Sequence, residues 1–155
     1  MRGTDMKLAT ALAERADLQR RLAELGTRLN NNAKTQEGEA PAEAPEELLR
    51  ELDEIFTCLE ELVSRINLTN SATVTDGTTL TELLARRDCL KQRVQIMRGF
   101  LNSASAKVDR YSRTEIRIVS TVSVTALQAD LDRISKELRE VDEQIQFLNW
   151  TTELM

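Results

Sequence analysis

The one compact polar cluster expected off the helices lies in the stretch before residue 116. It combines two guanidinium groups with a phenol and a carboxylate: Arg110, Tyr111, Arg113 and Glu115. Arginine side chains bind phosphate and carboxylate groups through paired hydrogen bonds, so the cluster is a candidate site for a small anion. The same side chains could instead anchor a long connector by salt bridges. We favour anchoring, because long loops need tethering.

Other signs of catalytic chemistry are few. The 155 residues include no histidine, the commonest general base and metal ligand. No glycine-rich phosphate loop and no nucleophile elbow is present. The two cysteines, Cys58 and Cys89, lack the spacing of a metal or redox pair and are expected to be reduced thiols. We therefore expect no metal and no cofactor, and we favour a non-enzymatic role over an enzyme.

Two arginines occupy positions where the apolar pattern leads us to expect leucine. Arg15 and Arg87 would lie in the seam between paired helices, where a guanidinium group needs a carboxylate or access to solvent. If each helix pair is antiparallel and closes at its connector, the nearest acids are Glu61 for Arg15 and Glu140 for Arg87. Two equivalent structural ion pairs are therefore predicted, and they are expected to set the register of the helices.

The spacing of apolar residues predicts four long helices that would position these groups. Apolar residues recur every three or four positions, the period of a helix with one buried face. The expected helices run from about Thr4 to Asn31, Pro45 to Asn70, Thr79 to Ser103 and Val124 to Trp150. Long helices joined in pairs form antiparallel hairpins. The predicted fold class is mainly α, with two tandem antiparallel helical hairpins packed like coiled coils.

The sequence also indicates an internal duplication. Residues 8–29 align with residues 80–101, and residues 48–70 align with residues 127–149. Leucines often align by chance in helical sequences, so the argument for a duplication depends on the aligned Arg, Asp, Glu and Asn residues. We predict a single domain over residues 1–155, with repeat one at about 5–74 and repeat two at about 79–153.

The two repeats differ in extra apolar rows outside the main seam. The second helix carries Leu49, Phe56 and Val63 at intervals of seven residues, and the third carries Ile96 and Phe100. The aligned positions in the other helices are polar or charged. A wider apolar face buries more of a helix, so these rows need a partner. They could pack on each other within one chain, or they could form an interface between subunits.

A short β segment is expected near residues 115–122, where β-branched residues are dense. A lone strand leaves its backbone donors and acceptors without partners. We expect it to pair with residues 33–37 of the first connector or with its copy in another subunit. Asp76 and Gly77 mark a tight turn between the second and third helices.

The composition limits the classes of partner that we expect the protein to bind. The formal net charge is −5 and only 3% of the residues are aromatic. We therefore expect an aliphatic core and no binding to nucleic acid, which would favour a basic excess. No apolar run approaches the ~18 residues of a membrane helix, and no signal peptide is seen. A cytoplasmic protein without membrane contact is expected.

Four segments resemble a family of small bacterial proteins often labelled septicolysin. They are LAERADLQRRL, NNAKTQEGEAPAEAPEELL, DRYSRTEIRIVSTV and LNWTTEL. The resemblance runs over nearly the whole chain and implies a fold of long helices. It implies no established activity for any residue, although the label suggests a cytolysin.

Three functions are compatible with these observations. The favoured one is a non-enzymatic cytoplasmic scaffold or assembly protein that forms homo-oligomers. The second is an anion-binding protein or enzyme that uses the Arg110–Glu115 segment, with an unknown small-molecule ligand. The weakest is a pore-forming protein, as the family label implies.

Overall fold

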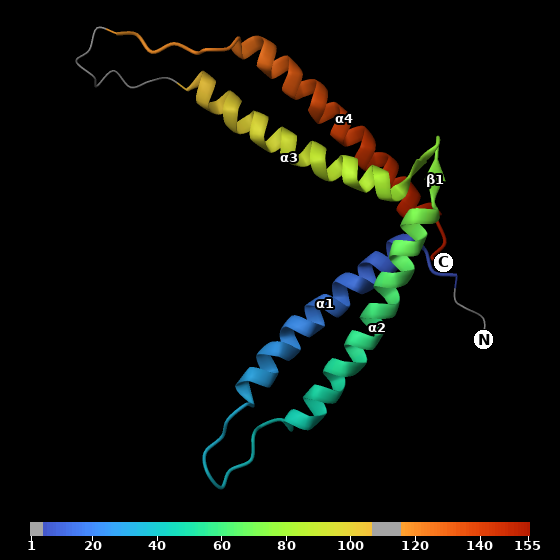
Figure 1. Ribbon diagram of the computed structural model, residues 1–155. Coiled ribbons are helices and arrows are strands. Elements are labelled where there is room, and N and C mark those ends of the chain that lie inside the picture. The colour runs from blue at the N-terminus through green and yellow to red at the C-terminus, as the bar shows by residue number, and fades with distance from the viewer. Residues whose placement is uncertain (1–4, 107–115) are drawn as a thin grey trace. The chain divides into compact units, whose positions relative to one another are not determined.

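The computed structural model describes residues 5–106 and 116–155, and these fall into two compact units. Unit 1 comprises residues up to Leu80 together with Gln146–Met155, and unit 2 comprises Thr81–Ile145. The elements follow in the order α1, α2, β1, β2, α3 and α4 (Figure 1). The mainly helical fold class with two antiparallel hairpins is therefore confirmed. The single domain and the duplication stay predictions.

Unit 1 is built on the antiparallel pair α1 (Leu8–Asn31) and α2 (Pro45–Ala72), which lie side by side (Figure 1). Pro45 begins α2 in the first turn, where its missing N–H costs nothing, and Glu46 and Glu47 complement the helix dipole there. The apolar stripes meet in a seam of buried side chains: Leu8, Ala11, Leu18 and Leu25 from α1, and Leu48, Ile55, Leu62 and Ile66 from α2. Burial of these side chains holds the hairpin together.

A tight β-hairpin follows α2. Its strands are β1 (Val74–Thr75) and β2 (Thr78–Thr79), with Val74 opposite Thr79 and Thr75 opposite Thr78. Asp76 and Gly77 form the turn with φ values of 48° and 77°. Positive φ at both central residues is the requirement of a type I′ turn, which explains the Asp-Gly pair.

The short β segment predicted near residues 115–122 is wrong in its location. Residues 116–123 hold no strand, and the chain's described sheet is the hairpin of β1 and β2. No backbone pairing joins residues 116–122 to residues 33–37. High β propensity produces a strand only where an edge is available to pair with, and within one chain this segment meets none.

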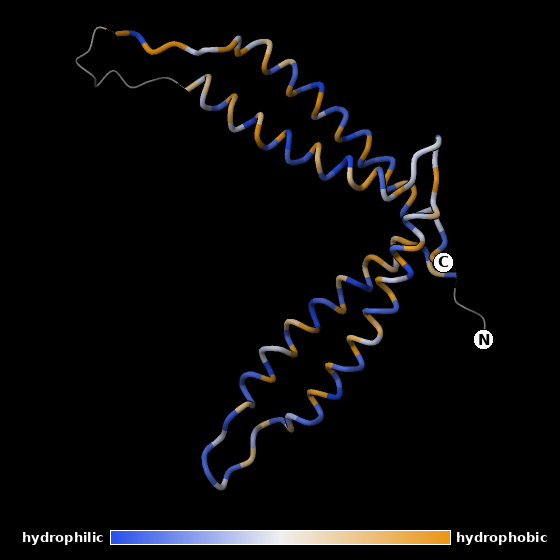
Figure 2. Tube along the Cα trace, viewed as in Figure 1, coloured by the Kyte–Doolittle hydropathy of each residue, from blue (hydrophilic) through white to orange (hydrophobic). Residues whose placement is uncertain are grey.

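Unit 2 contains most of α3 (Leu80–Ser105) and α4 (Val124–Thr151), which run antiparallel (Figure 1). Ser123 caps α4, because its Oγ accepts a hydrogen bond from the backbone N–H of Ala126 at 3.2 Å. In Figure 2, apolar and polar residues alternate along every helix. The seam of this unit buries Leu83, Leu90, Val94 and Leu101 of α3, and Leu131, Ile134, Val141 and Ile145 of α4.

The residues after α4 form a clasp on unit 1. The N–H of Leu8 donates to the carbonyl of Thr152 at 2.9 Å, and the N–H of Leu154 donates to Met6 at 2.8 Å. The N–H of Met155 donates to the Oγ1 of Thr69 at 3.0 Å, and that threonine is only 1% exposed. We use "terminal clasp" for residues 152–155 and these contacts. The clasp ties residues 152–155 to the start of α1 and the end of α2.

Candidate functional site

The predicted anion cluster lies outside the described residues. Arg110, Tyr111, Arg113 and Glu115 all fall in the stretch 107–115, so their arrangement stays a prediction.

The predicted partners of the seam arginines are wrong. Arg87 is largely buried and contacts the neighbouring Asp88 at 3.1 Å, while Glu140 pairs with Lys136 of its own helix at 3.9 Å. Arg15 is half-buried, and no ion pair within 4.0 Å joins it to the exposed Glu61. A two-helix seam has open sides, so a long guanidinium side chain can leave it and does not need an acid across the seam.

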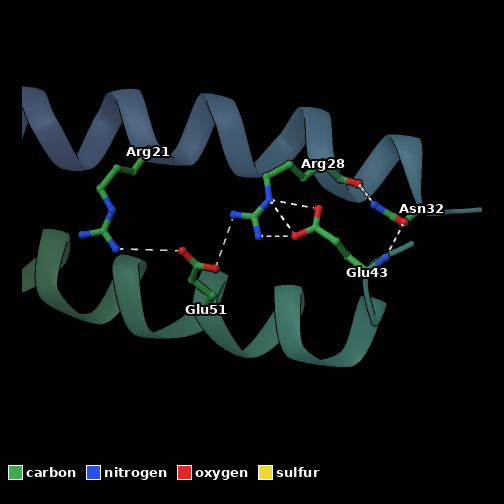
Figure 3. A network of polar contacts seen from close by, with 5 residues as sticks. All are labelled: Arg21, Arg28, Asn32, Glu43 and Glu51. Atoms are coloured by element: carbon green, nitrogen blue, oxygen red, sulfur yellow. Dashed lines mark hydrogen bonds and ion pairs between the residues drawn. The ribbon is translucent and has the colours of Figure 1, made fainter. Parts of the chain in front are cut away.

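Instead, the strongest polar network of unit 1 lies at the connector end of the hairpin (Figure 3). The Nε of Arg28 donates to both carboxylate oxygens of Glu43, at 3.1 and 3.2 Å. Glu51 lies 3.6 Å from Arg28 and 3.9 Å from Arg21, so it bridges the two arginines of α1. The network joins α1, the connector and α2, and we call it the connector anchor.

Asn32 completes the connector anchor. It is 8% exposed, and its amide donates to the carbonyl of Arg28 at 2.9 Å while accepting from the N–H of Glu43 at 2.9 Å. The hydrogen bond from Arg28 lowers the pKa of the Glu43 carboxyl, and the same bond raises the pKa of Arg28. Each charged form is stabilised by its partner, and both side chains remain partly exposed. These contacts indicate that the network fastens the connector to the two helices.

The second distinctive surface is the predicted apolar row of α2. Leu49 is 50% exposed, Phe56 is 52% exposed and Val63 is half-buried. Phe56 and Val63 border a shallow groove of about 480 Å³. The groove is lined by Phe56, Leu59, Glu60, Val63, Ser64 and Asn67.

Acidic residues run beside this row. Glu46, Asp53 and Glu60 are all exposed and follow one another at intervals of seven residues. Asp53 lies four residues after Leu49, and Glu60 lies four residues after Phe56, so each acid is one helical turn from an apolar side chain. We call this combination the α2 row: apolar in the middle and acidic along one side.

The corresponding surface in unit 2 is on α3. Ile96 is 72% exposed and Phe100 is 47% exposed, and Cys89 continues the line one heptad before Ile96. Arg86 and Arg93 lie three residues before Cys89 and Ile96 and are exposed as well. We call this combination the α3 row: apolar in the middle and basic along one side.

Arg86 also fastens the hairpin of unit 2. Its guanidinium donates to Glu137 of α4, and this hydrogen bond lowers the pKa of the Glu137 carboxyl. Arg93 adds a smaller favourable charge interaction with the same carboxylate. Of the two arginines in the α3 row, Arg86 is hydrogen-bonded to Glu137 and Arg93 is not, so Arg93 is the better candidate to pair with an acid of another chain.

A further apolar surface lies between α3 and α4 along the chain. Ile116, Ile118 and Val119 are all exposed. Figure 2 shows apolar colour on the trace that leads into α4. Ile118 and Val119 share a groove of about 240 Å³ with Phe100. Residues 116–122 therefore extend the apolar surface that begins on α3.

Within residues 5–106 and 116–155, no three acidic, cysteine or histidine side chains cluster as metal ligands would. Cys58 and Cys89 are free and exposed. None of the helices described is both long and apolar enough to cross a membrane.

These features define a protein of paired long helices whose most distinctive surfaces are exposed apolar rows. The chain belongs to the family of unknown function DUF6847, whose model matches residues 15–154. It is similar to a functionally unknown conserved protein from Corynebacterium diphtheriae, known from a crystal structure. The two are 43% identical over 98% of this chain and 100% of that one, with a TM-score of 0.91. No curated protein matches the chain.

The resemblance to the septicolysin-like family is therefore wrong. The family model and the solved structure both lead to proteins of unknown function, and neither points to that family. One of the four segments, LAERADLQRRL, has a spacing of Leu, Glu and Arg that unrelated helices commonly share. The pore-forming alternative rested on that label and loses its basis.

Proposed function

We propose that this protein is a non-enzymatic helical assembly protein that forms homo-oligomers through its exposed apolar rows. The observation that carries the proposal is the exposure of Phe56 and Ile96, at 52% and 72%, on helices whose seams are otherwise filled. Full burial of one such side chain contributes about 1.5–3 kcal/mol. Ordered rows of exposed apolar side chains are typical of protein interaction surfaces.

The proposal also accounts for the structural role of the polar contacts in unit 1. The connector anchor and the terminal clasp fasten unit 1 without leaving an unpartnered buried side-chain polar atom among the described residues. A scaffold needs rigid helices and a docking surface, and it needs no reactive group. The proposal places the protein in a reducing cytoplasm, where the exposed Cys58 and Cys89 remain thiols.

The test is analytical ultracentrifugation of the full chain over a range of concentrations. The parent should sediment as an oligomer, and Phe56→Glu should dissociate it, because a carboxylate cannot be buried in an apolar interface without a partner. Leu68→Glu is the matched control. Leu68 lies in the same helix and is 59% exposed, but it points about 120° around the helix from Phe56.

Circular dichroism should show equal helix content in both variants, since both positions are exposed. A parent that stays monomeric at high concentration would refute the proposal. So would a Phe56→Glu variant that associates as strongly as the parent.

A further inference from the structure

We infer that the α2 row of one chain docks on the α3 row of a second copy, and that two-fold symmetry repeats this contact. The inference rests on the proposed homo-oligomer and names the two surfaces that meet in it. In such a dimer, each copy contributes one α2 row and one α3 row. A closed pair of this kind is the commonest symmetry of soluble oligomers.

The first argument is the match in spacing between the rows. The α2 row places Leu49, Phe56 and Val63 at intervals of seven residues. The α3 row places Cys89 and Ile96 at the same interval, and Phe100 extends it by one turn. When the two helices are antiparallel, with Phe56 facing Ile96, the equal interval also brings Val63 opposite Cys89.

In this register, Val63 faces Cys89 at one end of the contact. Leu49 reaches the level of Phe100 and Ser103 at the other end. Phe56 and Val63 therefore face members of the α3 row, Leu49 lies within one turn of Phe100, and no charged residue falls in the middle of the contact.

The second argument is charge complementarity. The α2 row is bordered by Glu46, Asp53 and Glu60, whereas the α3 row is bordered by Arg86 and Arg93. In the same register, Glu60 lies within one turn of Arg93. Opposite charges at the edge of an interface guide the encounter and fix the register.

The same charges disfavour the alternative in which two α2 rows meet. A two-fold axis at Phe56 would place Asp53 of each copy within one turn of Glu60 of the other. Two such pairs of like charges would repel, and Arg50, which lies three residues before Asp53, offsets only part of this repulsion. Of the two exposed rows, only the α3 row offers an arginine border to the α2 row.

Disulfide trapping tests the register directly. The background is Cys58→Ser with Cys89→Ser, so that each chain carries a single thiol. A tagged chain with Phe56→Cys is mixed with an untagged chain with Ile96→Cys and then oxidised. The expected product is a cross-linked pair of the two different chains, because facing positions bring the two Cβ atoms to bridging distance. A mixture of Leu68→Cys with Ile96→Cys is the matched control and should stay unlinked.

A charge exchange tests the border. Glu60→Arg should weaken association about two- to fivefold, and adding Arg93→Glu should restore it, as expected for a partly exposed pair. Glu54→Arg, on an exposed residue outside the α2 row, should change association less and should not be rescued by Arg93→Glu.

The outcomes separate this inference from the proposed function. Oligomers in the ultracentrifuge without a link between positions 56 and 96 would overturn the inference and leave the proposed function standing. Linking of two Phe56→Cys chains to each other would show that α2 rows meet, and would overturn it too. A chain that carries both Phe56→Cys and Ile96→Cys and forms its disulfide only within itself, as a monomer, would contradict both proposals.

Discussion

The two hairpins have the same helical plan, but their connectors are fastened differently. In unit 1, the connector is held by Arg28, Glu43 and Asn32 through charged and neutral hydrogen bonds. In unit 2, the described part of the connector exposes Ile118 and Val119, and Ser120 makes two local hydrogen bonds with Val122. The comparison teaches that similar seams set similar helices, whereas the connector of unit 1 is held by polar contacts that the described residues 116–123 of unit 2 do not repeat.

The largest expected effect tests whether the seams are equivalent. Ile66→Ala in unit 1 and Ile145→Ala in unit 2 each remove a side chain that is 0% exposed. Each should lower the free energy of unfolding by about 2–5 kcal/mol, measured in urea. Leu68→Ala, at 59% exposure, is the control and should change stability by less than about 0.5 kcal/mol. Clearly unequal losses for the two isoleucines would show that the two seams are not equivalent.

The next effect concerns the terminal clasp, which only unit 1 has. Thr69→Val keeps the shape of the side chain but removes the hydroxyl that accepts from the Met155 N–H. The loss should be about 1–3 kcal/mol, with faster amide hydrogen exchange at Leu154. Thr57→Val is matched, because the hydroxyls of Thr69 and Thr57 both donate to the carbonyl four residues earlier, but Thr57 is exposed and lies outside the clasp. Equal effects of the two variants would show that the clasp adds nothing.

A smaller effect concerns the connector anchor. Glu43→Gln weakens the hydrogen bond to Arg28. In the parent protein, that bond lowers the pKa of the Glu43 carboxyl in the folded state. A lowered folded pKa stabilises the protein above the unfolded pKa, and that stability is lost as the pH falls through the folded pKa. The parent should therefore exceed Glu43→Gln in Tm at neutral pH, with the gap closing in acid. Glu39→Gln, at an exposed position of the same connector, should show no such gap. A gap that persists below the folded pKa would contradict this assignment.

The smallest effect on stability is expected at the connector of unit 2. Ile118→Ser changes a side chain that is 70% exposed, so the free energy of unfolding should move by less than about 0.5 kcal/mol. Aggregation on heating should nevertheless decrease, because an exposed β-prone segment offers open edges to other chains. Light scattering during a thermal ramp measures this aggregation. Unchanged scattering would show that this segment does not drive aggregation.

The helices could be predicted from the sequence because their signals are local. Pro45 and the three-to-four spacing of the leucines act within one or two turns, and the predicted ends agree with the structure to within a few residues. The strands of the hairpin are only two residues long, too short to show an alternating pattern, although Asp76-Gly77 indicated the turn.

The polar anchors were not predictable in the same way. The sequence pairs neither Arg28 with Glu43 nor Thr69 with Met155, because those contacts depend on the path of a connector and on a pairing across 86 residues. Exposed charges on a helix look alike in a sequence, whether or not an acid lies within reach. The apolar rows were predictable, since their intervals of seven residues set them apart from the seam.

The terminal clasp makes unit 1 discontinuous along the chain. Lys7 and Glu153 pair across 146 residues, so α1 and α2 leave the ribosome long before residues 152–155 can complete their unit. During synthesis the hairpin therefore has only its seam and the connector anchor to hold it, and the N–H of Leu8 bonds to water until Thr152 has been made. The same closeness of Met6 and Leu154 would let a designer reopen the chain between residues 35 and 40 and join residue 155 to residue 5 by a short linker. A chain permuted in this way would keep every contact of the clasp.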